Sequence, residues 1–182
     1  FSNFLEDHSI INALSINLTY PFENFLAKSL TKKGKLYIYE KKIKKSPIWV
    51  VFYNPIRTDK KPTKKQNIYK IKKLGKELAN FHLSCKNISN ILPVRSKKFS
   101  EDINFIKQHI SSKKYSHFDK IQRKEIVKQC DLFLNNTKTL LNKKNLLPVF
   151  IDWNIGNFSV DSDYNFFSRW DYDWFRIGHR TL

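Results

Sequence analysis

A cluster of residues that break regular structure, within positions 55–63, is the feature that most constrains how this chain can fold. Pro55 and Pro62 lack the backbone N–H that helices and sheets use, and Asp59 between them favours a turn. The residues before the cluster contain segments with strand character, whereas the residues after it show helical spacing over a long stretch. The break therefore predicts a boundary between two structurally different parts of the chain.

Before the break, the sequence predicts one helix followed by a pair of strands. Residues 2–16 carry apolar side chains at helical spacing. Residues 35–42 and 48–54 are rich in β-branched and aromatic residues, and lysines and a Ser-Pro pair separate them. We expect these two segments to pair as antiparallel strands.

After the break, three helices are predicted. The first begins near Thr63, which is a suitable N-cap directly after a proline. Its apolar face is expected to consist of Ile68, Ile71, Leu74, Leu78 and Phe81. Apolar spacing predicts two further helices at about 99–112 and 119–143, and Pro148 stops the second of them.

Short strands carrying acidic residues are predicted at the end of the sequence, at 149–152, 157–160 and 165–171. Strands and helices are thus segregated along the chain rather than alternating, which is typical of the α+β class. We expect an α+β protein with two lobes, residues 1–58 and residues 59–182.

The charge of the chain is strongly unbalanced. It carries 34 lysines and arginines against 16 aspartates and glutamates, a formal net charge of +18. A basic surface can bind nucleic acid, but the lysines are spread along the sequence and no zinc finger, helix-turn-helix signature or RNP-like aromatic strand accompanies them. We therefore disfavour a nucleic-acid partner, and expect a solvated basic surface or one that attracts a polyanionic substrate.

Nothing in the sequence predicts export or a membrane span. No apolar run approaches the roughly 20 residues that cross a bilayer, and the first residues lack the pattern of a signal peptide. The two cysteines, Cys85 and Cys130, are far apart and have no neighbouring metal ligands. We expect a cytoplasmic protein.

The acidic residues gather in one hydrophobic stretch, residues 150–178. Asp161 and Asp163 lie in the segment VDSDYN between two predicted strands, where such residues form turns. Asp152 and Asp171 instead each end an apolar strand, and Asn157 follows Asp152 by five residues. Grouped carboxylates repel one another unless a cation or a proton intervenes.

Two interpretations of Asp152, Asn157 and Asp171 remain open from spacing alone. Carboxylate and amide oxygens are suitable ligands for Mg²⁺, which completes its coordination with phosphate and water oxygens, so the residues would suit phosphoryl transfer. In the other interpretation, these residues are simply turn formers at the ends of short strands.

The sequence of this stretch resembles motifs of the family of aminoglycoside phosphotransferases, choline kinases and type II homoserine kinases. These enzymes have a protein-kinase-like fold. The family's loop reads H-x-D-x-x-x-x-N and its metal motif I-D-[FWY]-[DE]; here FIDWNIGN and RWDYDW stand in their places. The segment IKKLGKELANFHL is similar to the family's L-G-x-x-L-A-x-[LF]-H helix. The order and spacing agree over roughly residues 5–180.

The resemblance implies an ATP- and Mg²⁺-dependent kinase that phosphorylates a hydroxyl of a small molecule such as homoserine, choline or an aminoglycoside. It implies that Asp152 is the catalytic aspartate and that Asn157 and Asp171 hold the metal. The backbone of the hinge, Val51, Phe52 and Tyr53, would meet adenine.

The sequence departs from the family pattern at two points. Phe150 stands where the family has a histidine that supports the catalytic loop. A Gly-rich phosphate loop and a phosphate-binding lysine strand do not precede the first predicted helix, and we expect them before residue 1, with the helices of the acceptor pocket after residue 182. These departures leave a second hypothesis open, a kinase-like pseudoenzyme or binding module.

Overall fold

The computed structural model of the protein describes residues 1–55, 58–60, 62, 65–94, 98–112, 117–138 and 146–178. These residues form helices and small antiparallel two-stranded sheets, so the expected α+β class is confirmed. None of the described helices combines the length and the apolar character that crossing a membrane requires.

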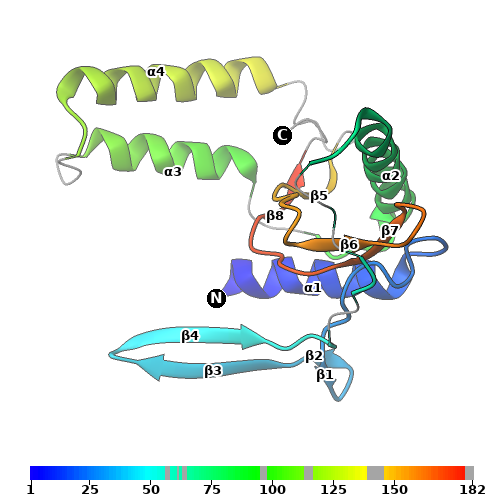
Figure 1. The fold of residues 1–182 in the computed structure, drawn as a ribbon. Coiled ribbons are helices and arrows are strands. Elements are labelled where there is room, and N and C mark those ends of the chain that lie inside the picture. The colour runs from blue at the N-terminus through cyan, green and yellow to red at the C-terminus, as the bar shows by residue number, and fades with distance from the viewer. Residues whose placement is uncertain are drawn as a thin grey trace.

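The first part of the chain is a helix followed by two hairpins (Figure 1). Helix α1 spans Ser2–Asn17, in agreement with the predicted 2–16. The first hairpin pairs β1 (Thr31–Lys32) with β2 (Lys35–Leu36), and the second pairs β3 (Ile38–Ile43) with β4 (Ser46–Val51). The predicted antiparallel strand pair is therefore present, although its first strand begins later than predicted.

Helix α2 begins later than predicted, and only the later part of its predicted apolar face packs in the core. Phe81 is buried, and Leu74 and Leu78 pack against the core cluster. The helix spans Ile68–Asn87, and the side chain of Asn67 caps it by accepting a hydrogen bond from Lys70 N at 2.9 Å. The predicted N-cap, Thr63, lies outside the described residues. The start of the predicted apolar face is exposed, with 67% of Ile68 and 52% of Ile71 accessible to solvent.

The buried residues of α2 are Glu77, Phe81 and Cys85. The buried carboxylate of Glu77 satisfies a backbone donor, because its Oε2 accepts a hydrogen bond from Phe166 N at 3.2 Å. Helical spacing was thus predicted correctly, but the residues that face the core depend on where the rest of the chain packs.

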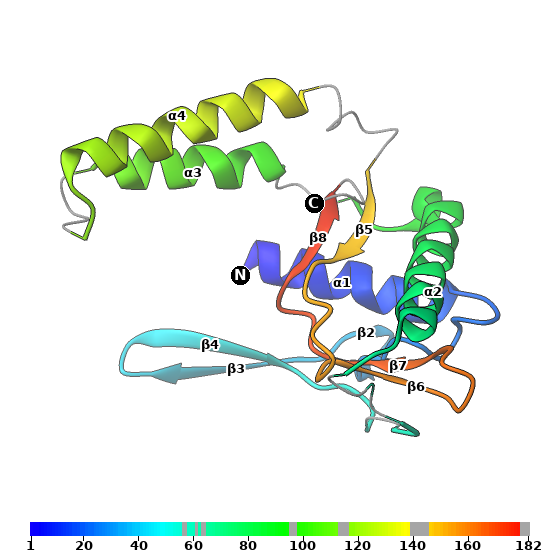
Figure 2. The same ribbon diagram turned by 45° about the horizontal axis from the view of Figure 1, so that its top comes forward.

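Helices α3 (Phe99–Ser111) and α4 (Lys120–Thr137) form an antiparallel pair that stands apart from the rest of the fold (Figures 1 and 2). A short 3-10 helix, η1 (Ser89–Ile91), follows α2. Asp119 and Gln122 form a capping box at the start of α4. The predicted helix at 99–112 is confirmed; α4 ends at Thr137, and the remainder of the predicted 119–143 from residue 139 lies outside the described residues.

The strands at the end of the chain pair in a way that the sequence did not indicate. β5 (Leu147–Phe150) pairs with β8 (Phe175–Gly178), and β6 (Phe158–Val160) pairs with β7 (Phe166–Arg169). Strand β8 was not predicted. Asp152 and Asp171 therefore follow strands of two different sheets, and loop contacts rather than strand pairing must bring them together.

The core joins the two ends of the chain. A single cluster of buried hydrophobic residues includes members of α1, of the loop after it, of α2 and of the last four strands. Its largest fully buried apolar members are Phe22, Phe25, Phe81, Phe150 and Phe175. The predicted boundary between residues 58 and 59 stays a prediction, but the buried cluster contains residues from both sides of it.

Candidate functional site

Asp152 lies in a loop directly after β5, and local donors satisfy its carboxylate. Oδ1 accepts a hydrogen bond from Asn154 N at 2.9 Å, and Oδ2 accepts one from Asn157 Nδ2 at 2.9 Å. The backbone of the loop forms a turn here, in which Asn157 N donates a hydrogen bond to Asn154 O at 2.8 Å. This pattern fixes the orientation of the carboxylate while leaving it half-buried rather than enclosed.

Asn157 connects the loop of Asp152 with the loop of Asp171. Its Nδ2 donates to Asp152, and its backbone oxygen accepts a hydrogen bond from Trp170 N at 3.0 Å. Trp170 is the residue before Asp171. Two of the three predicted site residues are thus in direct contact, and the third follows a residue that bonds to one of them.

Asp171 adopts an unusual backbone conformation and is exposed. Its φ is +66°, in the left-handed region that aspartate tolerates better than most residues with a side chain. Its Oδ1 accepts a hydrogen bond from Asp173 N at 3.3 Å, which forms a short turn. Asp171 is therefore exposed to solvent at a turn of the backbone.

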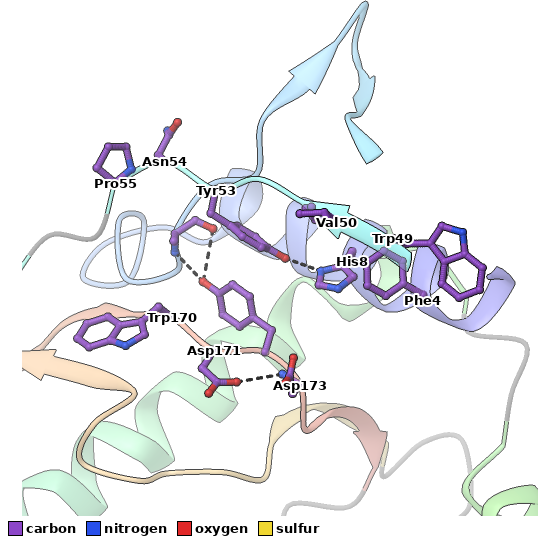
Figure 3. A pocket seen from close by; sticks show the side chains of 13 residues that line it. Phe4, His8, Trp49, Val50, Tyr53, Asn54, Pro55, Trp170, Asp171 and Asp173 are labelled. Carbon is purple, nitrogen blue, oxygen red and sulfur yellow. Dashed lines mark hydrogen bonds between the residues drawn. The ribbon is translucent and has the colours of Figure 1, made fainter. Parts of the chain in front are cut away.

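A cavity of about 630 Å³ lies beside this loop (Figure 3). Asp171 and Asp173 line one side, and Val51 and Tyr53 from the predicted hinge line another. The structure thus brings a predicted metal ligand and the predicted cofactor-binding segment to the same cavity. Phe52, Asp152 and Asn157 are described but do not line it.

Aromatic side chains form much of the cavity wall, and four of them come from distant parts of the sequence. They are Phe4, Trp49, Tyr53 and Trp170. No lysine or arginine is among the described residues that line the cavity. The electrostatic character of the cavity is therefore set by two carboxylates, in contrast to the basic chain as a whole.

Part of the predicted hinge backbone is already engaged within the protein. Phe52 O accepts a hydrogen bond from Leu30 N at 2.7 Å, and Asn54 N donates to Lys28 O at 2.9 Å. The ring of Phe52 stacks on Tyr37 outside the cavity, with ring centroids 5.8 Å apart. A ligand in the cavity would consequently meet the side chain of Tyr53 more directly than the backbone of Phe52.

His8 is a site residue that the sequence analysis missed, and it contacts the predicted Tyr53. His8 Nδ1 and the hydroxyl of Tyr53 form a hydrogen bond across the cavity wall (Figure 3). Burial lowers the pKa of His8, against the opposing effect of Asp173, and burial raises the pKa of Tyr53. Both side chains are thus neutral near pH 7, and no local sequence signal joins residues 45 positions apart.

Arg169 is a second residue that was not predicted. It is the last residue of β7, its side chain is 1% exposed, and its Nη2 donates to the backbone oxygen of Asp152 at 2.7 Å. Burial lowers the pKa of its guanidinium to about 10, although the nearby Tyr172, Asp152 and Asp171 act in the opposite direction. The group remains cationic at neutral pH and lies beneath the predicted catalytic aspartate.

The ligand chemistry of the site is compatible with a hard divalent cation. Among the described residues, no group of three or more His, Cys, Asp or Glu side chains could hold a metal by itself. Asp171 offers an exposed carboxylate, and Asn157 retains its Oδ1 because its Nδ2 bonds to Asp152. One carboxylate and one amide oxygen suit Mg²⁺, which commonly takes few protein ligands and completes its shell with water and phosphate.

The chain was also compared with known proteins. No protein-family model, no curated protein sequence and no solved structure matched it.

Proposed function

We propose that this protein is an ATP- and Mg²⁺-dependent phosphotransferase with a two-lobed, kinase-like fold, which transfers the γ-phosphate to a hydroxyl of a small molecule. One observation carries the proposal. Hydrogen bonds link Asp152 to Asn157 and Asn157 to Trp170, while the next residue, Asp171, lines a cavity together with Val51 and Tyr53. A base, a metal-ligand pair and a nucleotide-sized cavity are the parts that phosphoryl transfer requires.

Each residue has a distinct role in this proposal. Asp152 orients the acceptor hydroxyl and accepts its proton, because its carboxylate is held by two local hydrogen bonds and stays accessible. Asn157 and Asp171 hold Mg²⁺, which when bound offsets the negative charge of the phosphates. The side chain of Tyr53, beside Val51 and Phe52, contacts the adenine.

The aromatic walls of the cavity support a nucleotide base as one occupant. A planar base gains stacking and apolar contact from rings such as Tyr53 and Trp170. The acidic lining requires the phosphates to arrive with a cation, because no described lysine or arginine lines the cavity. We therefore expect ATP to bind only as its magnesium complex.

The composition of the cavity favours a second candidate function, the binding of an organic cation without catalysis. Phe4, Trp49, Tyr53 and Trp170 present aromatic rings, and Asp171 and Asp173 add negative charge. Rings and carboxylates together attract substituted ammonium groups. Phe150, in place of the histidine of the family that the sequence resembles, is consistent with such a kinase-like binding module.

Thermal unfolding distinguishes the two functions. If ATP and Mg²⁺ bind at 100 times Kd, the native state gains about 2.7 kcal/mol, which for a chain of this size raises Tm by about 5–10 °C. Asp171→Ala should abolish this shift. The matched variant Asp161→Ala, which removes a carboxylate from a turn of the same stretch, should retain it.

The outcomes separate cleanly. A shift that needs both ATP and Mg²⁺ supports the phosphotransferase, and radiolabelled phosphate transfer to homoserine, choline or an aminoglycoside then identifies the acceptor. A shift with tetramethylammonium in the absence of ATP and metal supports the binding module. No shift of the intact protein with Mg²⁺ and ATP over a wide concentration range overturns the phosphotransferase proposal.

A further inference from the structure

We propose that Arg169 is a positioning residue, which holds the loop of Asp152 in register with the loop of Asp171. The inference rests on the proposed phosphotransferase function. In that function, the proton acceptor Asp152 and the metal ligands Asn157 and Asp171 must keep fixed positions relative to one another. Arg169 can link the two loops because its side chain bonds to the Asp152 loop, and because it is the last residue of β7, directly before the Asp171 loop. Asp171 follows it by two residues.

The side chain of Arg169 lies against two aromatic rings. Its guanidinium lies 4.4 Å from the ring centroid of Trp153 and 5.0 Å from that of Phe150, the two residues that flank the start of the Asp152 loop. Its Nη2 donates to Asp152 O at 2.7 Å. A planar guanidinium can stack on rings and donate in its own plane at the same time, which an ammonium cannot.

The backbone of Arg169 is anchored just as firmly. Its N–H donates to Phe25 O at 2.6 Å, and its carbonyl oxygen accepts hydrogen bonds from Ala27 N at 3.2 Å and from the hydroxyl of Tyr172 at 2.9 Å. The segment 25–27 belongs to the buried core. The guanidinium is therefore presented to Asp152 from a rigid base, and not from a mobile loop.

The arginine is costly to bury, which argues against a purely stabilising role. Among the described residues, its Nε and Nη1 have no hydrogen-bond partner although both atoms are buried. Removing a cation from water without satisfying its donors costs free energy, and the groups that face such a cation lose their partner when it is deleted. The gain that offsets this cost lies in the fixed geometry of the loops.

Phe150 takes part in the same arrangement. The family that the sequence resembles has a loop-supporting histidine at this position, whereas here the guanidinium of Arg169 lies 5.0 Å from the ring centroid of Phe150. Support for the Asp152 loop therefore comes from Arg169 of β7, a strand of the other sheet. The exchange of a histidine for a phenylalanine does not by itself leave the loop without support.

The test compares Arg169→Met with Arg176→Met. Arg176 is a matched control because it is a half-buried arginine whose Nη1 also donates to a main-chain oxygen, that of Phe175 at 2.6 Å, and it does not line the cavity. Mn²⁺ binding followed by electron paramagnetic resonance, alone and with ATP, should weaken by about 10- to 100-fold in Arg169→Met, as for other residues that orient metal ligands. Tm should fall as well, because Asp152 O loses its buried donor, so binding is measured well below the Tm of the variant. Arg169→Lys should not rescue binding.

Weaker Mn²⁺ binding by a variant that is still fully folded at the temperature of the measurement is the signature of a positioning residue. If Arg169→Met lowers Tm and weakens Mn²⁺ binding only in proportion to the unfolded fraction, Arg169 is structural and the inference is overturned. Unchanged Mn²⁺ and ATP binding in this variant also overturns the inference, while it leaves the phosphotransferase proposal intact.

A second measurement does not depend on any ligand. Nuclear magnetic resonance order parameters of the backbone N–H groups of Asn154 and Asn157 should fall in Arg169→Met, whereas those of Asp163 and Asn165 should not change. Unchanged values at Asn154 and Asn157 contradict the positioning role. If these values fall but the wild-type protein binds no Mg²⁺ with ATP, the proposed function fails and only the loop anchor remains.

Discussion

Two loops of this protein, those of Asp152 and Asp161, have nearly the same local hydrogen bonding. In each, Oδ1 of the aspartate accepts from the backbone N–H two residues later, at 2.9 Å. In each, Oδ2 accepts from the Nδ2 of a following asparagine, also at 2.9 Å. Both are turns that an Asp and an Asn can form wherever a chain must bend.

The two loops differ in what lies behind them. The Asp161 turn connects β6 and β7, and Asn165 N adds a third hydrogen bond to its carboxylate. The Asp152 loop instead contacts a buried guanidinium through its backbone, and its Asn157 bonds to the residue before Asp171. An acidic turn is therefore a candidate site because of its tertiary neighbours and not because of its own pattern.

Activity provides the largest expected difference between the loops. Asp152→Asn removes the proton acceptor but keeps the size of the side chain, so we expect phosphate transfer to fall by about 100- to 10,000-fold. Asp161→Asn makes the same chemical change in the other turn and should leave transfer within about twofold. Initial rates with saturating ATP and acceptor provide the measurement.

Equal losses in these two variants would contradict the distinction between a site and a turn. Because Asp152→Asn is nearly isosteric, its Tm should remain close to that of the wild type. A large fall in Tm would assign Asp152 to the fold instead.

The next largest expected effect is a loss of stability when the hydrogen bond between Glu77 and the β6–β7 hairpin is removed. Glu77 is 7% exposed and accepts the N–H of Phe166 at the start of β7. Glu77→Ala leaves this buried donor without its acceptor, and the free energy of unfolding should fall by about 1–3 kcal/mol. Glu77→Gln keeps an acceptor and should cost less. Urea unfolding measures both, and an Ala variant as stable as the Gln variant would show that the bond contributes nothing.

The smallest effect concerns acid sensitivity of the Asp161 turn. Burial tends to raise the pKa of Asp161, but the side chain and backbone N–H of Asn165, the N–H of Asp163 and the charge of Lys73 outweigh it, so the pKa is lowered. A lowered carboxylate pKa stabilises the native state above the ordinary value of about 4, and this contribution is lost as the pH falls through the folded-state pKa.

Asp161→Ala should consequently destabilise the protein at pH 7 by less than about 1.5 kcal/mol. The difference from the wild type should shrink as the pH falls below about 4. Urea midpoints at pH 7 and at the lowest pH that keeps the protein folded measure this change. A difference that is constant with pH would show that the hydrogen bonds of the turn do not favour the ionised form.

Local patterns predicted the parts of the fold that depend on nearby residues. The α1 and α3 helices follow from apolar spacing, and the β3–β4 pair from two strand-forming segments joined by a two-residue turn. The turn at Asp161 was predicted from residue types that bond to their own backbone. The hydrogen bond between Asp152 and Asn157 spans only five positions, but the sequence left open whether these residues form a turn or a metal site.

Longer-range features could not be predicted in this way. Glu77 of α2 is buried beside the predicted Phe81, and its acceptor pairs with a donor of β7 that lies 89 positions away. The pairing of β5 with β8 joins residues about 30 positions apart, and no local pattern identified β8 as a strand. The cavity combines residues of α1, β4 and the Asp171 loop, which only packing brings together.

The sequence by itself thus determined helices α1, α3 and α4, the first strand pair and the turn at Asp161. Tertiary structure alone decided that Asp171 shares a cavity with Val51 and Tyr53, and that Arg169 lies beneath Asp152. The reason is physical. Hydrogen bonds within a few residues follow from the local chain, whereas burial of a guanidinium against two rings depends on how distant segments fill the core.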